Sequence, residues 1–175
     1  MTGALADRVI DAVLQDEGGL SNHADDRGGL THFGLTKPFL SDVTGRDWSD
    51  EGIRQMSVAT ARSVFRLWMG MRRLDQLPED YLLAWVVTDY AVHSGSRVAI
   101  KAVQTYLGCA ADGIAGAETQ ARWHRLAEPE RRALVAHVLA ARLELIGAWI
   151  TKTPSQAVFA KGVMRRIAHQ VRACA

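Results

Sequence analysis

The stretch EGGLSNHADDRGGLTHFGLT, residues 17–36, is the most informative part of this chain. It places one acid, Glu17, at the end of an apolar-faced helix and continues into a glycine-rich polar loop with Asp26 and Thr31. No other part of the chain brings carboxylates, hydroxyls and glycines together so densely. This combination predicts a site built around Glu17 as a catalytic acid.

The helix before this stretch is expected over residues 4–17, where apolar side chains recur at helical spacing from Leu5 to Val13. Glu17 follows Val13 by four positions, so its side chain is expected to point the same way as the buried stripe. The glycines that come next are a typical signal for the end of a helix.

The rest of the chain has no internal repeat and no long linker. Residues 20–36 lack a helical period and predict a short loop or hairpin. Ser57 is the expected N-cap of a helix over 58–71. Further helices are expected over 37–45, 79–93, 97–107, 117–126, 129–150 and 154–171. The predicted fold class is therefore all-α, with a small β-hairpin or irregular loop near the site.

The length of 175 residues indicates one domain or a domain with a small appendage, and 48% hydrophobic residues are typical of a globular protein. No apolar run approaches the roughly 20 residues that span a bilayer. Asp7, Arg8 and Asp11 interrupt any signal-peptide core, so we expect synthesis in the cytoplasm without a signal peptide. The two cysteines, Cys109 and Cys174, predict neither a disulfide framework nor a zinc site.

Charge is divided unevenly along the chain. Residues 1–120 hold 11 basic and 16 acidic residues, a net charge of −5, whereas residues 121–175 hold 10 and 3, a net charge of +7. The basic part fits either a solvated helix face or a surface for a polyanion, such as a cell-wall polymer, a membrane surface or nucleic acid. No standard nucleic-acid-binding motif accompanies the arginines, so we expect no nucleic-acid partner.

The chemistry near Glu17 suits hydrolysis of a glycosidic bond. Partial burial and the negative end of a helix both favour the protonated carboxyl, which can protonate a leaving oxygen. Asp26 lies nine positions later, across a loop that can fold back and hold a water between the two acids. Thr31 is the candidate to orient that water. The distance between the two carboxyl groups decides between inversion and retention, and ordinary turn chemistry is the alternative role for Asp26.

The same residues resemble the signature of glycoside hydrolase family 108, the phage-type and secretion-associated N-acetylmuramidases. The likeness begins with EGGL at 17–20 and DDRGGLTHFGLT at 25–36. It continues in order with DYAVHSG at 89–95, QTYLG at 104–108, ADGIAG at 111–116, and FAKG at 159–162 followed by Arg165 and Arg166. Nearly the whole chain is covered.

This resemblance implies a lysozyme-like helical fold without a cofactor. It implies a catalytic part over 1–95 and a peptidoglycan-binding helical part over 96–175, packed as one compact unit. It also implies that Glu17 is the acid that cleaves the β-1,4 bond between N-acetylmuramic acid and N-acetylglucosamine. The substrate contacts that it implies are His32, Gly34, Asp89, His93 and Ser94.

Several positions depart from the family pattern. Leu20 stands where a tyrosine is frequent, and Arg27 stands where a proline precedes the glycine pair. His32 and His93 both replace asparagines, which would add titratable groups near the site. Val163 replaces a tryptophan.

The expected partner is the glycan strand of peptidoglycan, bound by a monomer without stable membrane insertion. Action in the periplasm or at the cell wall would then require release by a holin or export by a secretion system. A wall-binding module without catalysis is the alternative function, and intact Glu17, Asp26 and Thr31 argue against it. A metal site built from His23, His32 and His93 with Asp25 or Asp89 fits no standard ligand spacing, so none is predicted.

Overall fold

The structure is a computed structural model that describes residues 1–175 except 18, 22–28, 155–156 and 175. The chain divides into two compact units, Met1–Asp75 and Gln76–Ala175, which we call unit 1 and unit 2. The helix that carries Asp89 packs against the helices that follow it, so residues 76–95 belong to unit 2. The functional division expected from the resemblance, a catalytic part over 1–95 and a wall-binding part over 96–175, stays a prediction.

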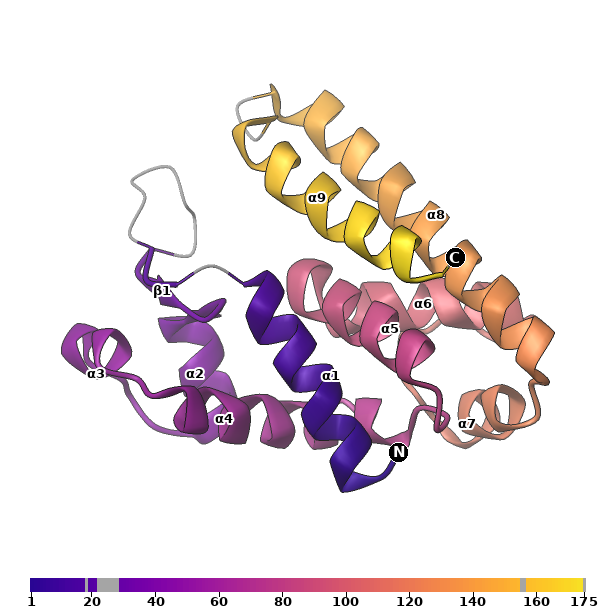
Figure 1. Ribbon diagram of the computed structural model, residues 1–175, viewed down its shortest axis with the longest axis horizontal. Coiled ribbons are helices and arrows are strands. Elements are labelled where there is room, and N and C mark those ends of the chain that lie inside the picture. The colour runs from indigo at the N-terminus through magenta and orange to yellow at the C-terminus, as the bar shows by residue number, and fades with distance from the viewer. Residues whose placement is uncertain (18, 22–28, 155–156, 175) are drawn as a thin grey trace. The chain divides into compact units, whose positions relative to one another are not determined.

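Unit 1 is helical with one small antiparallel hairpin (Figure 1). Its elements are α1 (Gly3–Asp16), β1 (Thr31–His32), β2 (Leu35–Thr36), α2 (Lys37–Thr44), α3 (Asp50–Arg54) and α4 (Val58–Met71). A 3₁₀ turn, η1 (Leu74–Gln76), spans the boundary to unit 2. The hairpin and the helices at 58–71 and 37–44 confirm the sequence predictions, while the short helix α3 was not predicted.

Local sequence explains where these helices begin. Thr2, Thr36, Ser49 and Ser57 each accept a hydrogen bond from a backbone N–H in the first turn of α1, α2, α3 and α4. At the other end of α2, Gly45 takes a left-handed conformation with φ of 67°. These contacts satisfy backbone groups that a helix leaves unpaired at its ends.

The core of unit 1 forms where α4 packs against α1 and α2. Val9 and Val13 of α1 are buried, as the helical spacing predicted. On α4, Phe65 and Trp68 form an edge-on pair with ring centroids 6.3 Å apart, and Phe39 of α2 packs against both. This packing holds the end of α1 in a fixed place, and Glu17 comes directly after it.

Unit 2 is a bundle of five helices among its described residues: α5 (Tyr81–Ser94), α6 (Ser96–Leu107), α7 (Ala117–His124), α8 (Glu128–Lys152) and α9 (Ala157–Ala173). Helix α5 is the central one. Nine consecutive residues, 83–91, are buried, and α6, α8 and α9 all pack on it. A helix that is apolar on all sides must be covered on all sides, which explains why α5 belongs to unit 2.

The turn between α6 and α7 is held by a buried glutamine, Gln104. Three acceptors, Asp112 Oδ1, the carbonyl of Ile114 and the Thr119 hydroxyl, lie 2.8–3.0 Å from its amide nitrogen, whose two hydrogens they share. Its amide oxygen accepts the backbone N–H of Gly113 at 2.8 Å. The turn expected at 111–116 is therefore held against α6 by Gln104, and Arg97 of α6 also donates to the carbonyl of Asp112 at 3.3 Å.

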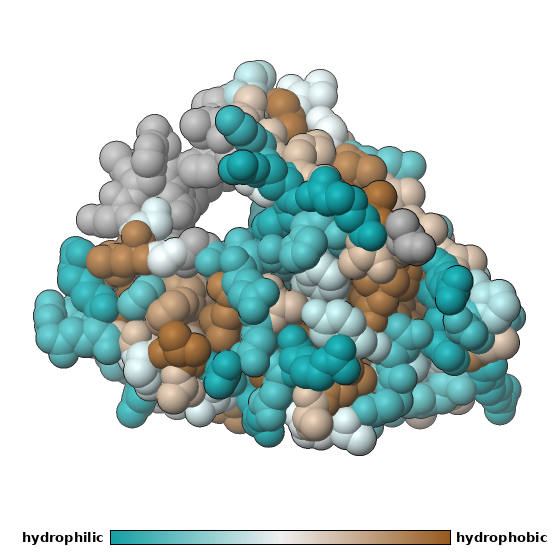
Figure 2. Space-filling model, in the orientation of Figure 1, coloured by the Kyte–Doolittle hydropathy of each residue, from teal (hydrophilic) through white to brown (hydrophobic). Residues whose placement is uncertain are grey.

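By length and composition alone, α8 could cross a membrane, contrary to the expectation from sequence. One third of its most apolar window is buried in the fold. Arg142 lies within α8, fully buried and paired with Asp89 of α5. Helix α8 packs on α5 and α6, and exposed apolar side chains lie among polar ones along it in Figure 2.

Candidate active site around Glu17

Glu17 is the residue that ends α1. Its backbone has left the helix, with φ of −77° and ψ of 136°, and its N–H still donates to the carbonyl of Val13 at 2.9 Å. The side chain is half-buried. The helix therefore fixes the backbone of Glu17 while its carboxyl group remains partly accessible.

The carboxyl group of Glu17 lies against the backbone of Gly34. A methyl group built on Gly34 would come within 2.5 Å of Cδ, 2.6 Å of Oε2 and 2.8 Å of Cγ of Glu17. Such distances are far inside van der Waals contact, so only glycine leaves this carboxyl group in place. Gly34 also has φ of 75°, a conformation that glycine adopts without strain.

Gly34 lies at the tip of the hairpin. Strands β1 and β2 pair Thr31 with Thr36 and His32 with Leu35, which leaves Phe33 and Gly34 as a two-residue turn. Both turn residues have positive φ, 53° and 75°, as a type I′ turn requires. Left-handed backbone is strained for phenylalanine, so the fold holds Phe33 against its local preference.

The hairpin is tied to the rest of unit 1 at three places. Ser21 and Thr31 exchange two backbone hydrogen bonds of 2.8 and 2.9 Å. Thr36 both ends β2 and caps α2. His32 donates from Nδ1 to the carbonyl of Ile53 in α3 at 2.9 Å, because a carbonyl oxygen can only accept. The ring of His32 also stacks on Phe33, with centroids 4.0 Å apart.

Of the other two predicted catalytic residues, Thr31 lies within the described part of the chain and Asp26 does not. Thr31 lies on β1 and its hydroxyl donates to the carbonyl of Gly29 at 3.2 Å, which leaves its lone pairs able to accept. Asp26 lies outside the described residues. The structure thus brings Glu17 and Gly34 together and places Thr31 and His32 on the adjacent strand.

Asp89 occupies a different environment from the one expected of a substrate contact. It is fully buried in unit 2, where its carboxylate accepts from Arg142 at 2.6 Å and from Gln170 at 3.0 Å, and also from Arg166. Burial alone would raise the pKa of Asp89, but the Arg166 and Arg142 guanidinium groups hold it below its usual value. A direct contact with substrate would require that burial to be undone, so the geometry gives Asp89 a structural role.

His93 and Ser94 lie one turn further along α5, at its C-terminal end. They are half-buried, and His93 Nδ1 lies 3.0 Å from the Ser94 hydroxyl. They line a small pocket together with residues of α6 and α8, among them Trp149, which sequence reasoning did not single out.

Residues 10–95 match the model of the family described as glycosyl hydrolase 108. This segment contains Glu17, the hairpin and the DYAVHSG stretch. The chain belongs to glycosyl hydrolase family 108. No curated protein sequence matches it significantly.

A solved structure supports the same assignment across the whole chain. The structure of Brucella abortus SagA superposes with a TM-score of 0.78 at 27% sequence identity, over 99% of this chain and 95% of that chain. The all-α, lysozyme-like fold predicted from the sequence is therefore confirmed. The family assignment makes this chain a member of a family of peptidoglycan hydrolases.

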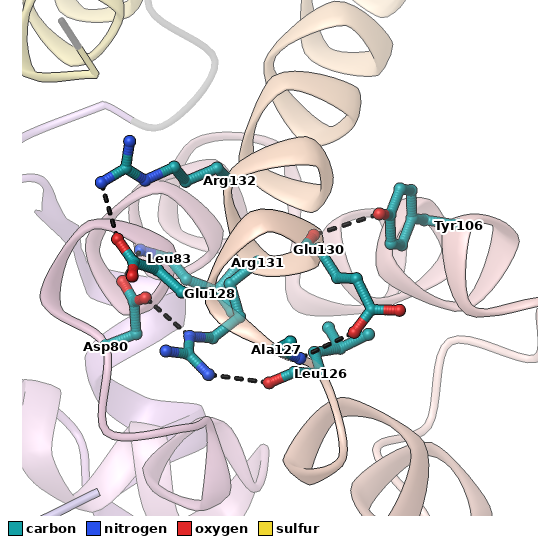
Figure 3. A network of polar contacts seen from close by, with 9 residues as sticks. All are labelled: Asp80, Leu83, Tyr106, Leu126, Ala127, Glu128, Glu130, Arg131 and Arg132. Carbon is teal, nitrogen blue, oxygen red and sulfur yellow. Dashed lines mark hydrogen bonds and ion pairs between the residues drawn. The ribbon is translucent and has the colours of Figure 1, made fainter.

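Several arginines in the basic part of this family 108 chain, residues 121–175, are paired with acidic side chains. Arg131 reaches Asp80 at 3.0 Å and the carbonyl of Leu126 at 2.7 Å, and Arg132 reaches Glu128 at 2.6 Å (Figure 3). Arg122 pairs with Glu118 in the same way. Contacts of this kind reduce the number of arginines that could bind a polyanion, which leaves the +7 charge of residues 121–175 a weak argument for nucleic acid.

A larger hollow of about 590 Å³ lies between α5, α8 and the end of α9. Its walls are apolar, and Arg132 and Cys174 are the residues with polar groups among those that line it. None of the described residues that line it has a carboxylate that could act on a glycosidic bond. Among the described residues, no group of three or more histidine, cysteine, aspartate or glutamate side chains is arranged to hold a metal ion.

Proposed function

We propose that this family 108 chain is an N-acetylmuramidase that cleaves the β-1,4 bond between N-acetylmuramic acid and N-acetylglucosamine in peptidoglycan. The observation that carries the proposal is the contact between the Glu17 carboxyl group and Gly34, inside the segment that matches the family. A carboxyl group held by a rigid helix end and a tied hairpin is a positioned acid, and general acid catalysis needs such positioning.

In this proposal Glu17 protonates the glycosidic oxygen as the bond to the muramic acid carbon breaks. The leaving N-acetylglucosamine keeps that proton as its new hydroxyl. Water then supplies the hydroxyl of the new reducing end, and its proton returns to a carboxylate. Thr31 is placed on β1 with lone pairs able to accept a hydrogen bond from that water.

Gly34 supports this chemistry because it has no side chain. The backbone of the hairpin tip approaches the Glu17 carboxyl group so closely that any side chain would displace it. The strain at Phe33 is held by the contacts of its neighbours, since His32 is bonded to α3 and Leu35 is fully buried. The tip is thus pre-organised before substrate arrives.

Mass analysis of the soluble products from purified peptidoglycan tests the proposal. Borohydride reduction should convert muramic acid at the new reducing ends to muramitol, and the Glu17→Gln chain should release nothing. Reduced glucosamine at those ends would identify a glucosaminidase and overturn the muramidase assignment. Binding to the wall without release by the unaltered chain would favour the non-catalytic binding module.

The same assay decides the role of Asp26, which the proposal assigns to positioning the attacking water. Asp26→Ala should lower the rate of release by about two orders of magnitude or more. A loss of only a few fold would leave Asp26 with the ordinary turn chemistry of an aspartate that bonds nearby backbone N–H groups.

A further inference from the structure

Unit 2 has an apolar groove that the proposed hydrolysis does not use. It is the hollow of about 590 Å³ between the start of α5, one face of α8 and the end of α9, and its size lies within the range of roughly 300–1,000 Å³ that is typical of ligand sites. Figure 2 shows apolar surface beside the C-terminal end of α9. Leu143 and Val171 line the groove and are exposed, so it is open to solvent.

The groove follows the axis of α8. Its lining residues on this helix recur at helical spacing from Arg132 to Leu143, so they form one stripe. These two residues lie about 16 Å apart along the helix axis. The residues of the stripe between them are all aliphatic: Val135, Ala136, Leu139 and Ala140. A polar group placed there would lose its hydrogen bonds to water, so a long apolar stripe favours an aliphatic chain over a polar polymer.

The end of α9 forms the facing wall with small, uncharged groups. Ala173 and Cys174 line the groove there together with Val171. The Cys174 thiol donates to the carbonyl of Gln170 at 3.2 Å, and burial raises the pKa of this thiol. Cys174 is therefore a neutral group near pH 7, and none of the lining residues of α9 presents a charge to the aliphatic stripe.

A smaller, polar hollow of about 200 Å³ adjoins the groove at the start of α8. The two share three lining residues, Leu82, Arg132 and Val135. The other residues that line the polar hollow are all charged: Asp80, Glu128 and Arg131. Figure 3 shows the four charged side chains on one side of the first turns of α8. Two guanidinium groups and two carboxylates therefore meet at one end of an apolar groove, and their charges balance.

The two ion pairs of the polar hollow differ in exposure. Glu128 and Arg132 pair at 2.6 Å with 63% and 75% of their side chains exposed, whereas Asp80 and Arg131 pair at 3.0 Å and are less exposed. An exposed pair contributes little to stability, so Glu128 and Arg132 can exchange each other for ligand groups at little cost. A headgroup with a phosphate and an ammonium group pairs with both, while a purely anionic headgroup would face the Glu128 carboxylate.

We infer that the groove and the polar hollow of unit 2 together bind one single-chain phospholipid with a zwitterionic headgroup. Its aliphatic chain lies along α8 against the end of α9. Arg132 binds the phosphate and Glu128 binds the ammonium group, while Asp80 and Arg131 remain paired beside them. The site uses no residue of unit 1 and does not depend on the proposed hydrolysis.

Titration calorimetry on the full chain measures the affinity for lysophosphatidylethanolamine, kept below the concentration at which it forms micelles. Lysophosphatidylglycerol with the same chain lacks the ammonium group and should bind about tenfold more weakly. Glycerophosphoethanolamine has the headgroup without the chain and should show no binding. Equal affinity for the two lysolipids, or no saturable binding of the first, would overturn the inference. Binding of the chainless headgroup as tightly as the lysolipid would do the same.

The two cysteines report where the lipid lies. Cys174 lines the groove and Cys109 does not. At about ten times its Kd, the lysolipid should slow the reaction of Cys174 with a maleimide about tenfold, because about one tenth of the chain remains unoccupied, and it should leave the rate at Cys109 unchanged. Mass analysis of the labelled peptides separates the two sites. No slowing at Cys174, or equal slowing at both cysteines, would place the lipid elsewhere and overturn the inference.

Matched substitutions on α8 test the aliphatic wall. Ala140 and Ala133 are both exposed, but only Ala140 lines the groove. Ala140→Glu should weaken binding about tenfold or more, because its carboxylate would meet the aliphatic chain. Ala133→Glu adds the same charge to the same helix and should bind the lysolipid as the unaltered chain does. Equal affinities of the two variants would overturn the inference.

A second pair of variants tests the headgroup contact. Arg132→Gln should weaken binding about tenfold through the loss of the phosphate contact. Arg122→Gln is the control, because Arg122 forms an equivalent pair with Glu118 in α7 and lines neither hollow. Unchanged affinity in Arg132→Gln would remove Arg132 from the site and overturn the assignment of the headgroup.

A second copy of the chain and an intact bilayer are the competing occupants of the groove. Sedimentation equilibrium without lipid should give a monomer, and a dimer that Ala140→Glu dissociates would assign the groove to a subunit interface. Sedimentation with bilayer vesicles, without any response to the monomeric lysolipid, would identify a membrane-binding surface. Either result would overturn the inference.

Discussion

Glu17 and Asp89 are two carboxylates of the family-matched segment with opposite surroundings. Glu17 is half-buried at a helix end, with its carboxyl group against the bare backbone of Gly34. Asp89 is fully buried in the middle of α5 and is held by Arg142, Arg166 and Gln170. The Glu17 carboxyl group is fixed in place and partly accessible to solvent, whereas the Asp89 carboxylate is fixed in place and buried by its neighbours.

The comparison shows that a motif residue can serve either chemistry or packing, and that burial and charge decide which. A carboxylate enclosed by two guanidinium groups is held ionised and cannot deliver a proton. The carboxyl group of Glu17 lies beside backbone and is partly exposed, so a substrate can reach it. The following predictions test this contrast, from the largest expected effect to the smallest.

Glu17→Gln should lower the rate of peptidoglycan clearing by about 10²–10⁴-fold, the usual contribution of a general acid. The substitution keeps the shape of the side chain, so the thermal unfolding midpoint should stay close to that of the unaltered chain. Turbidity clearing and calorimetry on the same preparation measure the two effects. Retained clearing would remove Glu17 from the mechanism.

Asp89→Ala should act mainly on stability, and it should lower the free energy of unfolding by about 3–5 kcal/mol. The reason is that Arg142, which has no exposed surface, would keep its charge without the buried partner. Denaturant unfolding of the purified chain measures the loss.

The double variant Asp89→Leu with Arg142→Met is the control for that experiment. Removing both charges should recover part of the lost stability, since a buried pair replaced by apolar groups is often neutral. A loss below about 1 kcal/mol for Asp89→Ala would contradict the buried network, because exposed ion pairs contribute only that much.

Gly34→Ala should lower activity by about 10²-fold, because the new methyl group would push the Glu17 carboxyl group out of place. Gly45→Ala is a matched control. Gly45 has φ of 67°, close to the 75° of Gly34, but nothing lies within 4 Å of a methyl group built there. Both variants should lose about 1 kcal/mol of stability from backbone strain, and only Gly34→Ala should lose activity. Equal activities would show that the contact with Glu17 has no catalytic consequence.

His93→Asn should change how stability depends on pH. The pKa of His93 falls from 6.5 to about 4 in the folded chain, so the unfolded chain binds that proton more readily. The stability of the unaltered chain is therefore lost as the pH falls from 6.5 toward 4, by roughly 2–3 kcal/mol. His93→Asn should lose less over the same interval, as measured by denaturant midpoints. Parallel pH profiles would show that His93 is not buried as described.

Local structure in this chain could be predicted because local sequence causes it. Ser57 and Thr36 cap the helices that they were expected to cap, and Gly45 ends α2 as a glycine does. The hairpin followed from a stretch without helical period that is rich in glycine. The short helix α3 was missed because one turn of helix is too brief to show a period.

Contacts between residues that are distant in the sequence could not be predicted in the same way. Asp89 is the single acidic residue of the apolar helix α5, and Arg142 is a buried charge of α8. A buried charge needs a partner, but spacing along the chain does not identify that partner. The contact between Trp149 and His93 could not be predicted for the same reason, since it depends on which helices pack together.

By itself the sequence determined an all-α chain with a glycine-rich hairpin after Glu17, because caps, glycines and apolar spacing act over a few residues. Only the tertiary structure decided which carboxylate is covered, which glycine must remain bare and which aromatic ring joins His93. Those outcomes depend on packing between segments distant in the sequence, where burial sets both the energy of a charge and the space left for a side chain.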